Sequence, residues 1–148
     1  MAERSPDALT REPIEVGHLT SGLAGAADGA IATFVGVVRD NQDGRAVQRL
    51  EYEAHEPMAE AQVAQLVSNA TRRWGLSAVR LRHRLGSIGI GEVSVFIGVA
   101  SPHRAEALEA CRWLIDTLKA EVPIFKKEYY VDGGTSWVEE GTGDAGPG

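Results

Sequence analysis

Cysteine is almost absent from this sequence, and basic residues are fewer than acidic ones. The single cysteine, Cys111, excludes an internal disulfide and disfavours a cysteine-based metal site. Against 21 aspartates and glutamates stand 15 lysines and arginines, which gives a net charge of -6. This balance argues against a sequence-independent nucleic-acid binder, because such a protein needs a broad basic face. A local basic pocket for a small anion is still allowed.

Long hydrophobic runs are also missing. No apolar stretch approaches the roughly 20 residues that cross a bilayer, and the polar N-terminus lacks a signal-peptide core. We therefore expect a cytoplasmic protein with no membrane partner. The 148 residues, 43% hydrophobic and 24% charged, are typical of one globular domain. We place this domain at residues 13–140, between a flexible lead at 1–12 and a flexible tail at 141–148.

Hydrophobic periodicity predicts an α+β domain with a largely antiparallel sheet. A central apolar strand is expected at 30–38 and another at 47–54, with Val47, Leu50 and Tyr52 pointing inward. The other predicted elements are strands at 14–16, 78–85 and 92–100, helices at 19–27, 58–74 and 103–119, and a hairpin over 125–139. The apolar face of the last helix is predicted to contain Ala107, Leu108, Cys111, Leu114, Ile115 and Leu118.

A glycine-rich segment at residues 86–91, G-S-I-G-I-G, invites a nucleotide-binding interpretation. The dinucleotide fingerprint has glycines at its first, third and sixth places and opens a helix. Here the glycines stand at the first, fourth and sixth places, and a strand is expected to follow. The segment therefore predicts a hairpin turn.

Three lysines gather between the last helix and the hairpin. Lys119, Lys126 and Lys127 flank Pro123 in a chain that is acidic overall. They could be surface lysines, since most charge clusters are solvated. In a shared pocket, a lysine tuned toward neutrality could serve as general acid, general base or nucleophile. Because neighbouring strand residues face opposite sides, we expect Lys126, and not Lys127, to share a pocket with Lys119.

Three further basic groups stand where anions are commonly bound. Arg39 follows the apolar strand at 30–38 and suits bidentate binding of phosphate or carboxylate. His103 and Arg104 follow Ser101 and Pro102, which we expect to cap and begin the last helix. An anion at that terminus would be attracted by the helix dipole and by both side chains. The alternative for all three is ordinary solvent exposure. The other histidines show no metal-binding spacing, and Cys111 is expected in the core.

Helix geometry limits how these groups can meet. His103 and Lys119 are 16 residues apart on one predicted helix. At 1.5 Å per residue they lie ~24 Å apart, so one small ligand cannot touch both. Either the chain has two sites, or a symmetric dimer brings His103 and Arg104 of one copy to Lys119 and Lys126 of the other. We favour the dimer.

Several segments resemble the catalytic large subunits of molybdopterin synthase, the MoaE family. They are G-A-I-A-T-F-V-G-V-V-R-D (29–40), L-E-Y-E-A-H (50–55), H-R-L-G (83–86), G-E-V-S-V-F-I-G-V-A-S-P-H-R (91–104) and L-K-A-E-V-P-I-F-K-K-E (118–128). The resemblance covers roughly residues 12–140. It departs from the family pattern at His55, where tyrosine is frequent, and at Lys127, where arginine is frequent.

The resemblance implies a fold, a reaction and partners. The fold is an α/β hammerhead with an antiparallel β subdomain. The enzyme transfers sulfur from the C-terminal thiocarboxylate of a small ubiquitin-like subunit to cyclic pyranopterin monophosphate (precursor Z) and forms the molybdopterin dithiolene, with no cofactor or metal. Two large subunits form a central dimer that carries one small subunit at each end. The alternative is a non-catalytic dimeric module that binds a small anion or a ubiquitin-like protein.

The resemblance also implies a set of functional residues. Lys119 and Lys126 are the expected catalytic groups, with Lys119 nearest the thiocarboxylate. Arg39, His103 and Arg104 would hold the cyclic phosphate and the pterin. The full substrate-contacting set falls on Val37, Val38, Arg39, His103, Arg104, Lys119, Lys126, Lys127 and Glu128.

Overall fold

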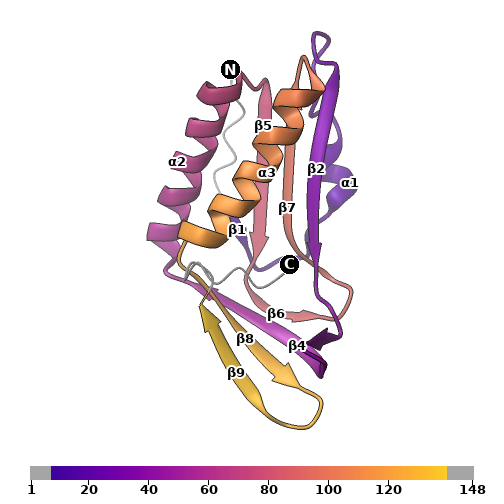
Figure 1. Cartoon of the computed structure of the whole chain (residues 1–148), viewed down its shortest axis with the longest axis vertical. Coiled ribbons are helices and arrows are strands. Elements are labelled where there is room, and N and C mark those ends of the chain that lie inside the picture. The colour runs from indigo at the N-terminus through magenta and orange to yellow at the C-terminus, as the bar shows by residue number, and fades with distance from the viewer. Residues whose placement is uncertain (1–7, 140–148) are drawn as a thin grey trace.

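A four-stranded sheet and a five-stranded sheet form the framework of residues 8–139, the part of the chain that this computed structural model describes (Figure 1). The first sheet has the order β1-β5-β7-β2, formed by Leu9–Thr10, Ala78–Arg84, Val93–Ser101 and Ala30–Val37. Strands β5 and β2 pair antiparallel with β7, and the short β1 pairs parallel with β5. Strand β7 is almost wholly buried, as expected for a central strand covered on both faces.

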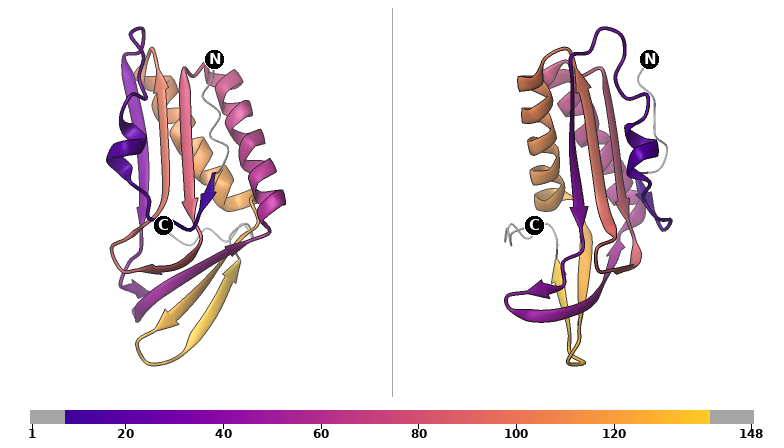
Figure 2. Two further views of the ribbon diagram at one scale, coloured as in Figure 1. Left: turned by 180° about the vertical axis from the view of Figure 1, so that it is seen from behind. Right: turned by 90° about the vertical axis from the view of Figure 1, so that its right-hand side faces the viewer.

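Helices α2 (Glu56–Trp74) and α3 (Arg104–Glu121) lie side by side on one face of this sheet (Figure 1). The short α1 (Val16–Thr20) lies on the other face (Figure 2). Pro57 stands in the first turn of α2, and Gly75 ends the helix in the left-handed conformation at φ 61°. The rings of Trp74 and Trp113 pack 5.7 Å apart between the two long helices.

The second sheet extends beyond the C-terminal end of α3 (Figure 1). Its order is β3-β4-β8-β9, formed by Asn41–Gln42, Arg45–Ala54, Ile124–Tyr130 and Thr135–Glu139, and β6 (Gly86–Gly89) also pairs with β4. All of these pairings are antiparallel. The arrangement confirms the predicted α+β class and the antiparallel β subdomain.

The predicted inward residues of β4 are confirmed, although they break strict alternation. Val47, Leu50 and Tyr52 are all buried. Residues 47 and 50 should face opposite sides of a regular strand, but the register with β8 shifts between Val47 and Arg49. The irregularity turns the strand so that all three side chains share one face.

Four predictions of local structure are wrong. Strand β2 is at an edge of its sheet, not at its centre. The segment at 86–89 is strand β6, not part of a turn, because it finds an open edge of β4. The strand predicted at 14–16 is absent from the described chain, and the helix predicted at 19–27 is α1, which ends at Thr20. Tertiary contacts outweigh local propensity in such short segments.

The ends of α3 and of the domain also differ from prediction. Ser101 ends β7 and His103 is the N-cap of α3, which begins at Arg104. Leu108, predicted on the apolar face, is 61% exposed. Leu9–Thr10, expected in the flexible lead, forms β1, and both carboxylate oxygens of Glu60 accept backbone N–H groups of Ala8 and Leu9. The predicted flexibility of 1–7 and 141–148 concerns residues outside those described.

The long helices carry charged residues throughout. Across residues 8–139, we find no helix that is both long enough and apolar enough to traverse a bilayer.

Candidate active site

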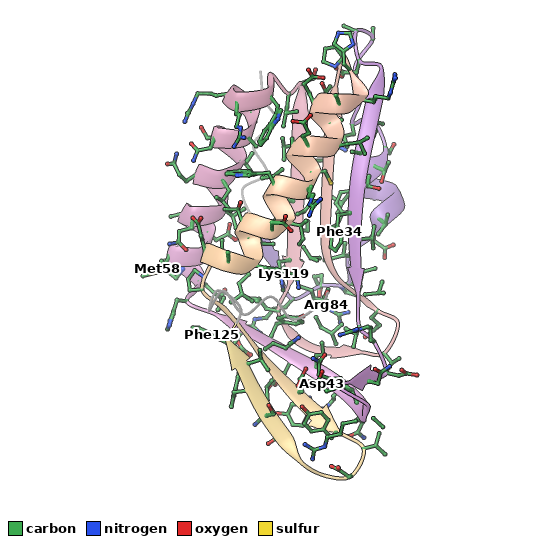
Figure 3. All side chains as sticks on the ribbon, in the orientation of Figure 1. Phe34, Asp43, Met58, Arg84, Lys119 and Phe125 are labelled. Atoms are coloured by element: carbon green, nitrogen blue, oxygen red, sulfur yellow. The ribbon has the colours of Figure 1, made fainter. Side chains whose placement is uncertain are left out.

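A cavity of about 220 Å³ lies where α3 and β2 meet the second sheet. Figure 3 shows Lys119 at the end of α3 nearest that sheet. Apolar walls come from β2, β4 and β7. Gly36 leaves no room for a side chain, because a Cβ there would lie 2.7 Å from a methyl group of Val95. The polar side chains in the wall are Arg39, Asn41, Gln42, Tyr52, Ser94, Lys119, Lys126 and Glu128.

Lys119 and Lys126 reach the cavity from different elements. Lys119 stands in the last turn of α3, where a lysine also complements the helix dipole. Lys126 stands on β8 opposite Tyr52 of β4, and its side chain is 16% exposed. Both lysines line this cavity, so the prediction that they share a pocket is confirmed.

Glu128 supplies the carboxylate of the cavity. It stands two residues after Lys126 on the same face of β8, and it is 3% exposed. The Tyr130 hydroxyl donates to Glu128 Oε1 at 2.5 Å, and Lys126 Nζ lies 3.7 Å from Glu128 Oε2. The hydrogen bond to the carboxylate raises the pKa of Tyr130, because the hydroxyl is held in its donating form. Each oxygen of Glu128 thus faces a different group.

Arg39 and the two residues of β3 form the outer wall. The Arg39 guanidinium donates to the side-chain oxygen of Gln42 at 3.0 Å. Val37 is 53% exposed and lines the cavity, whereas Val38 is buried in the core. Of this predicted group, Val37 and Arg39 therefore line the cavity together with the lysines, and Val38 does not.

Lys127 faces away from the cavity. Its ammonium lies 5.0 Å from the ring centre of Tyr129 and 5.4 Å from that of Trp137, on the other face of β8. This is the side expected from strand alternation, so one chain does not bring Lys127 to Lys119.

His103 and Arg104 also lie apart from the cavity. They stand at the N-terminal end of α3, the end away from the second sheet (Figure 1). The helix places them ~24 Å from Lys119, as expected from its rise per residue. A single chain therefore does not combine these two groups of predicted site residues.

His83 is the main residue that sequence reasoning missed. It is 6% exposed, and with Lys119 and Tyr52 it lines a second cavity of about 20 Å³ beside the first. Burial, and secondarily the charge of Lys119, lower its pKa to about 4. A signal was available, because His83 falls between Leu81 and Leu85 at an inward position of an alternating strand.

The charges of the larger cavity favour an anionic ligand. Among the described residues, three cations, Arg39, Lys119 and Lys126, and one carboxylate, Glu128, line this cavity. A guanidinium and ammonium groups suit phosphate or carboxylate, and lysines in a confined site can stabilise negative charge that develops during a reaction. Cys111 belongs to the core as predicted, and burial raises the pKa of its thiol to about 11. Within residues 8–139, histidine, cysteine and carboxylate side chains form no cluster suited to a metal ion.

Comparisons with known proteins point to one family. The family model described as "MoaE protein" matches residues 9–121. The molybdopterin synthase catalytic subunit of Nostoc sp. is 38% identical over 135 residues, which cover 90% of this chain and 82% of that protein. The crystal structure of molybdopterin synthase from Staphylococcus aureus superimposes with a TM-score of 0.84 at 34% identity, covering 92% of this chain and 98% of that one.

A fourth match comes from a complex. The structure of subunits 1 and 2 of molybdopterin-converting factor from Helicobacter pylori contains a chain that superimposes with a TM-score of 0.62 at 25% identity. The match covers 76% of this chain and 72% of that chain.

Proposed function

Because this chain belongs to the MoaE family, we propose that it acts as the catalytic subunit of a molybdopterin synthase. The observation that carries this proposal is the convergence of Lys119, Lys126 and Arg39 on one cavity. Lys119 comes from α3, Lys126 from β8, and Arg39 from the loop that connects β2 of the first sheet to β3 of the second. The fold therefore brings together residues that are distant in the sequence.

The reaction is the transfer of sulfur to a pterin. The donor is the C-terminal thiocarboxylate of a small ubiquitin-like subunit, and the acceptor is cyclic pyranopterin monophosphate. Both carry negative charge, and the three cations of the cavity suit both. The Helicobacter pylori structure is a complex of two subunits of a molybdopterin-converting factor, which supports a small-subunit partner for this chain.

The four charged residues of the cavity, Arg39, Lys119, Lys126 and Glu128, each have a proposed role. Lys119 polarises the thiocarboxylate carbonyl or moves protons as sulfur is transferred. Lys126 stabilises the negative charge that develops, and Glu128 holds its ammonium at 3.7 Å. Arg39 binds the cyclic phosphate. Val37, at the mouth of the cavity, contacts the substrate.

His103 and Arg104 complete the site from a second copy of the chain. They lie ~24 Å from Lys119 along one helix, so they can act on the same ligand only across a symmetric dimer. The proposed assembly is a central dimer of this chain with one small subunit bound at each end.

Reconstitution tests the proposed function. The protein is mixed with thiocarboxylated small subunit and precursor Z, and the dithiolene pterin is measured. An enzyme produces it in repeated turnovers. A non-catalytic module, the alternative, binds the small subunit or the anion and produces none.

A cytoplasmic location completes the proposal. Cell fractionation followed by immunodetection of the chain tests it, with the protein expected beside cytoplasmic marker enzymes.

A further inference from the structure

His83 lies directly under the end of α3 that carries Lys119. It stands on the helix-facing side of β5, paired across the sheet with Val95, and it is 6% exposed. The cavity of about 20 Å³ is lined by both His83 and Lys119. Tyr52, Ser94 and Lys119 line this cavity and the larger one, so the two are neighbours.

The hydrogen bonding of His83 fixes which ring nitrogen carries the proton. Nδ1 lies 2.9 Å from the backbone carbonyl oxygen of Arg84. A carbonyl oxygen can only accept, so Nδ1 donates, and the neutral ring keeps a lone pair on Nε2. Tyr52 fixes the ring from the side through an edge contact, with centroids 4.8 Å apart. His83 is therefore a rigid, neutral acceptor inside the protein.

The small cavity offers a place for one water molecule. A volume of about 20 Å³ is enough for one, and a buried water needs at least two polar partners. His83, Lys119 and Ser94 supply polar groups in its wall.

We propose that His83 is a positioning residue for Lys119, accepting at Nε2 a hydrogen bond that a single water relays from the Lys119 ammonium. The interaction holds the lysine toward the larger cavity and stabilises its charged form. The proposal rests on the role of Lys119 in the proposed function. It concerns a residue that touches no reacting atom itself.

Other charged and titratable groups around Lys119 also influence the charge state of its ammonium. Those facing it are Tyr52 from β4, Lys126 and Glu128 from β8, Arg39 after β2, and His83 from β5. Arg39 and Lys126 repel the ammonium, and Glu128 attracts it. Removing the His83 acceptor leaves the ammonium less well solvated, which favours the neutral amine.

Competitive labelling with acetic anhydride measures the protonation of Lys119 directly. The full-length protein is labelled over a range of pH, and the peptide that contains Lys119 is quantified by mass spectrometry. In His83→Phe, which keeps the ring volume but has no nitrogen, the midpoint for Lys119 is expected to fall by about one pH unit. In His83→Gln, which keeps an acceptor, it stays near the wild-type value. Lys127, on the other face of β8, serves as the internal control.

An unchanged Lys119 midpoint in His83→Phe overturns the proposal. If that variant does not fold, His83→Asn replaces it, because Asn keeps a donor near Nδ1 but does not reach the position of Nε2. The same midpoint for Lys119 in His83→Asn and His83→Gln then overturns the proposal. Labelling needs no turnover, so its outcome is independent of whether the protein produces a dithiolene. Where turnover is present, His83→Phe should lower kcat about tenfold and His83→Gln should restore most of it.

Discussion

The Tyr130 hydroxyl donates a hydrogen bond of 2.5 Å to Glu128 inside the protein, between residues two apart on one face of β8. The other oxygen of Glu128 lies 3.7 Å from Lys126. A buried carboxylate needs such partners, since an uncompensated charge in the interior is costly. Tyr130 therefore holds Glu128 in the orientation that faces the cavity lysines.

Tyr130→Phe should weaken both stability and turnover. Loss of a hydrogen bond to a buried charged group costs about 1.5–3 kcal/mol, and Glu128 is then free to turn away from Lys126. Urea unfolding and the reconstitution assay measure the two effects. Tyr129→Phe is the matched control, because the Tyr129 hydroxyl bonds to Glu51 outside the cavity at 3.1 Å. Equal losses in both variants would contradict a special role for Tyr130.

Lys126 and Lys127 are adjacent in sequence but face opposite sides of β8. Lys126→Ala removes an ammonium from the cavity, whereas Lys127→Ala removes one that lies over aromatic rings. We expect kcat to fall at least tenfold further in Lys126→Ala than in Lys127→Ala. Steady-state measurement of dithiolene formation decides this. A larger loss of kcat in Lys127→Ala would indicate that the reaction takes place on the face of β8 opposite the cavity, and would contradict this prediction.

The sequence predicts the long elements and the local facing of residues well. Period-two alternation placed Lys126 and Lys127 on opposite faces of β8, and helical spacing separated His103 from Lys119. Both conclusions depend only on the number of residues between two positions on one helix or strand, and this number is read directly from the sequence. Charge and alternation had already selected Lys119 and Lys126, and the family resemblance then gave them catalytic roles.

Tertiary partners account for what could not be predicted. Strand β6 forms because it can pair with an open edge of β4. Strand β1 is held in place because the Glu60 carboxylate of α2 accepts hydrogen bonds from two backbone N–H groups. Neither partner is visible in the local pattern. The alternation of β5 indicates that His83 is buried, but its position beside Lys119 depends on how the end of α3 packs and could not be predicted.

His83 should also make stability depend on pH. Its pKa is about 4 in the folded protein, against 6.5 for an ordinary histidine. Between these values the unfolded chain binds a proton that the folded chain excludes, so stability falls as the pH drops from 6.5 to 4. The difference corresponds to about 3 kcal/mol when fully expressed. Urea unfolding at pH 7 and pH 4.5 should show a smaller loss in His83→Gln than in the wild type, and equal losses would refute this.

Mixed dimers test whether the site is shared between chains. A Lys119→Ala chain and a His103→Ala chain each lack one half of every composite site in their homodimers. A heterodimer of the two has one intact site, so it should recover up to about half of wild-type activity. Differently tagged chains, purified through both tags, provide verified heterodimers. No recovery in them would show that His103 and Lys119 do not act on one ligand across the dimer.

Turnover by Lys119→Ala is the most direct test of the role assigned to the cavity. The variant is mixed with thiocarboxylated small subunit and precursor Z, and dithiolene formation is measured beside the affinity for the small subunit. The structure places Lys119 at the junction of both cavities, so we predict a loss of at least 100-fold in kcat with unchanged affinity for the small subunit. Wild-type turnover in Lys119→Ala would contradict the proposed mechanism.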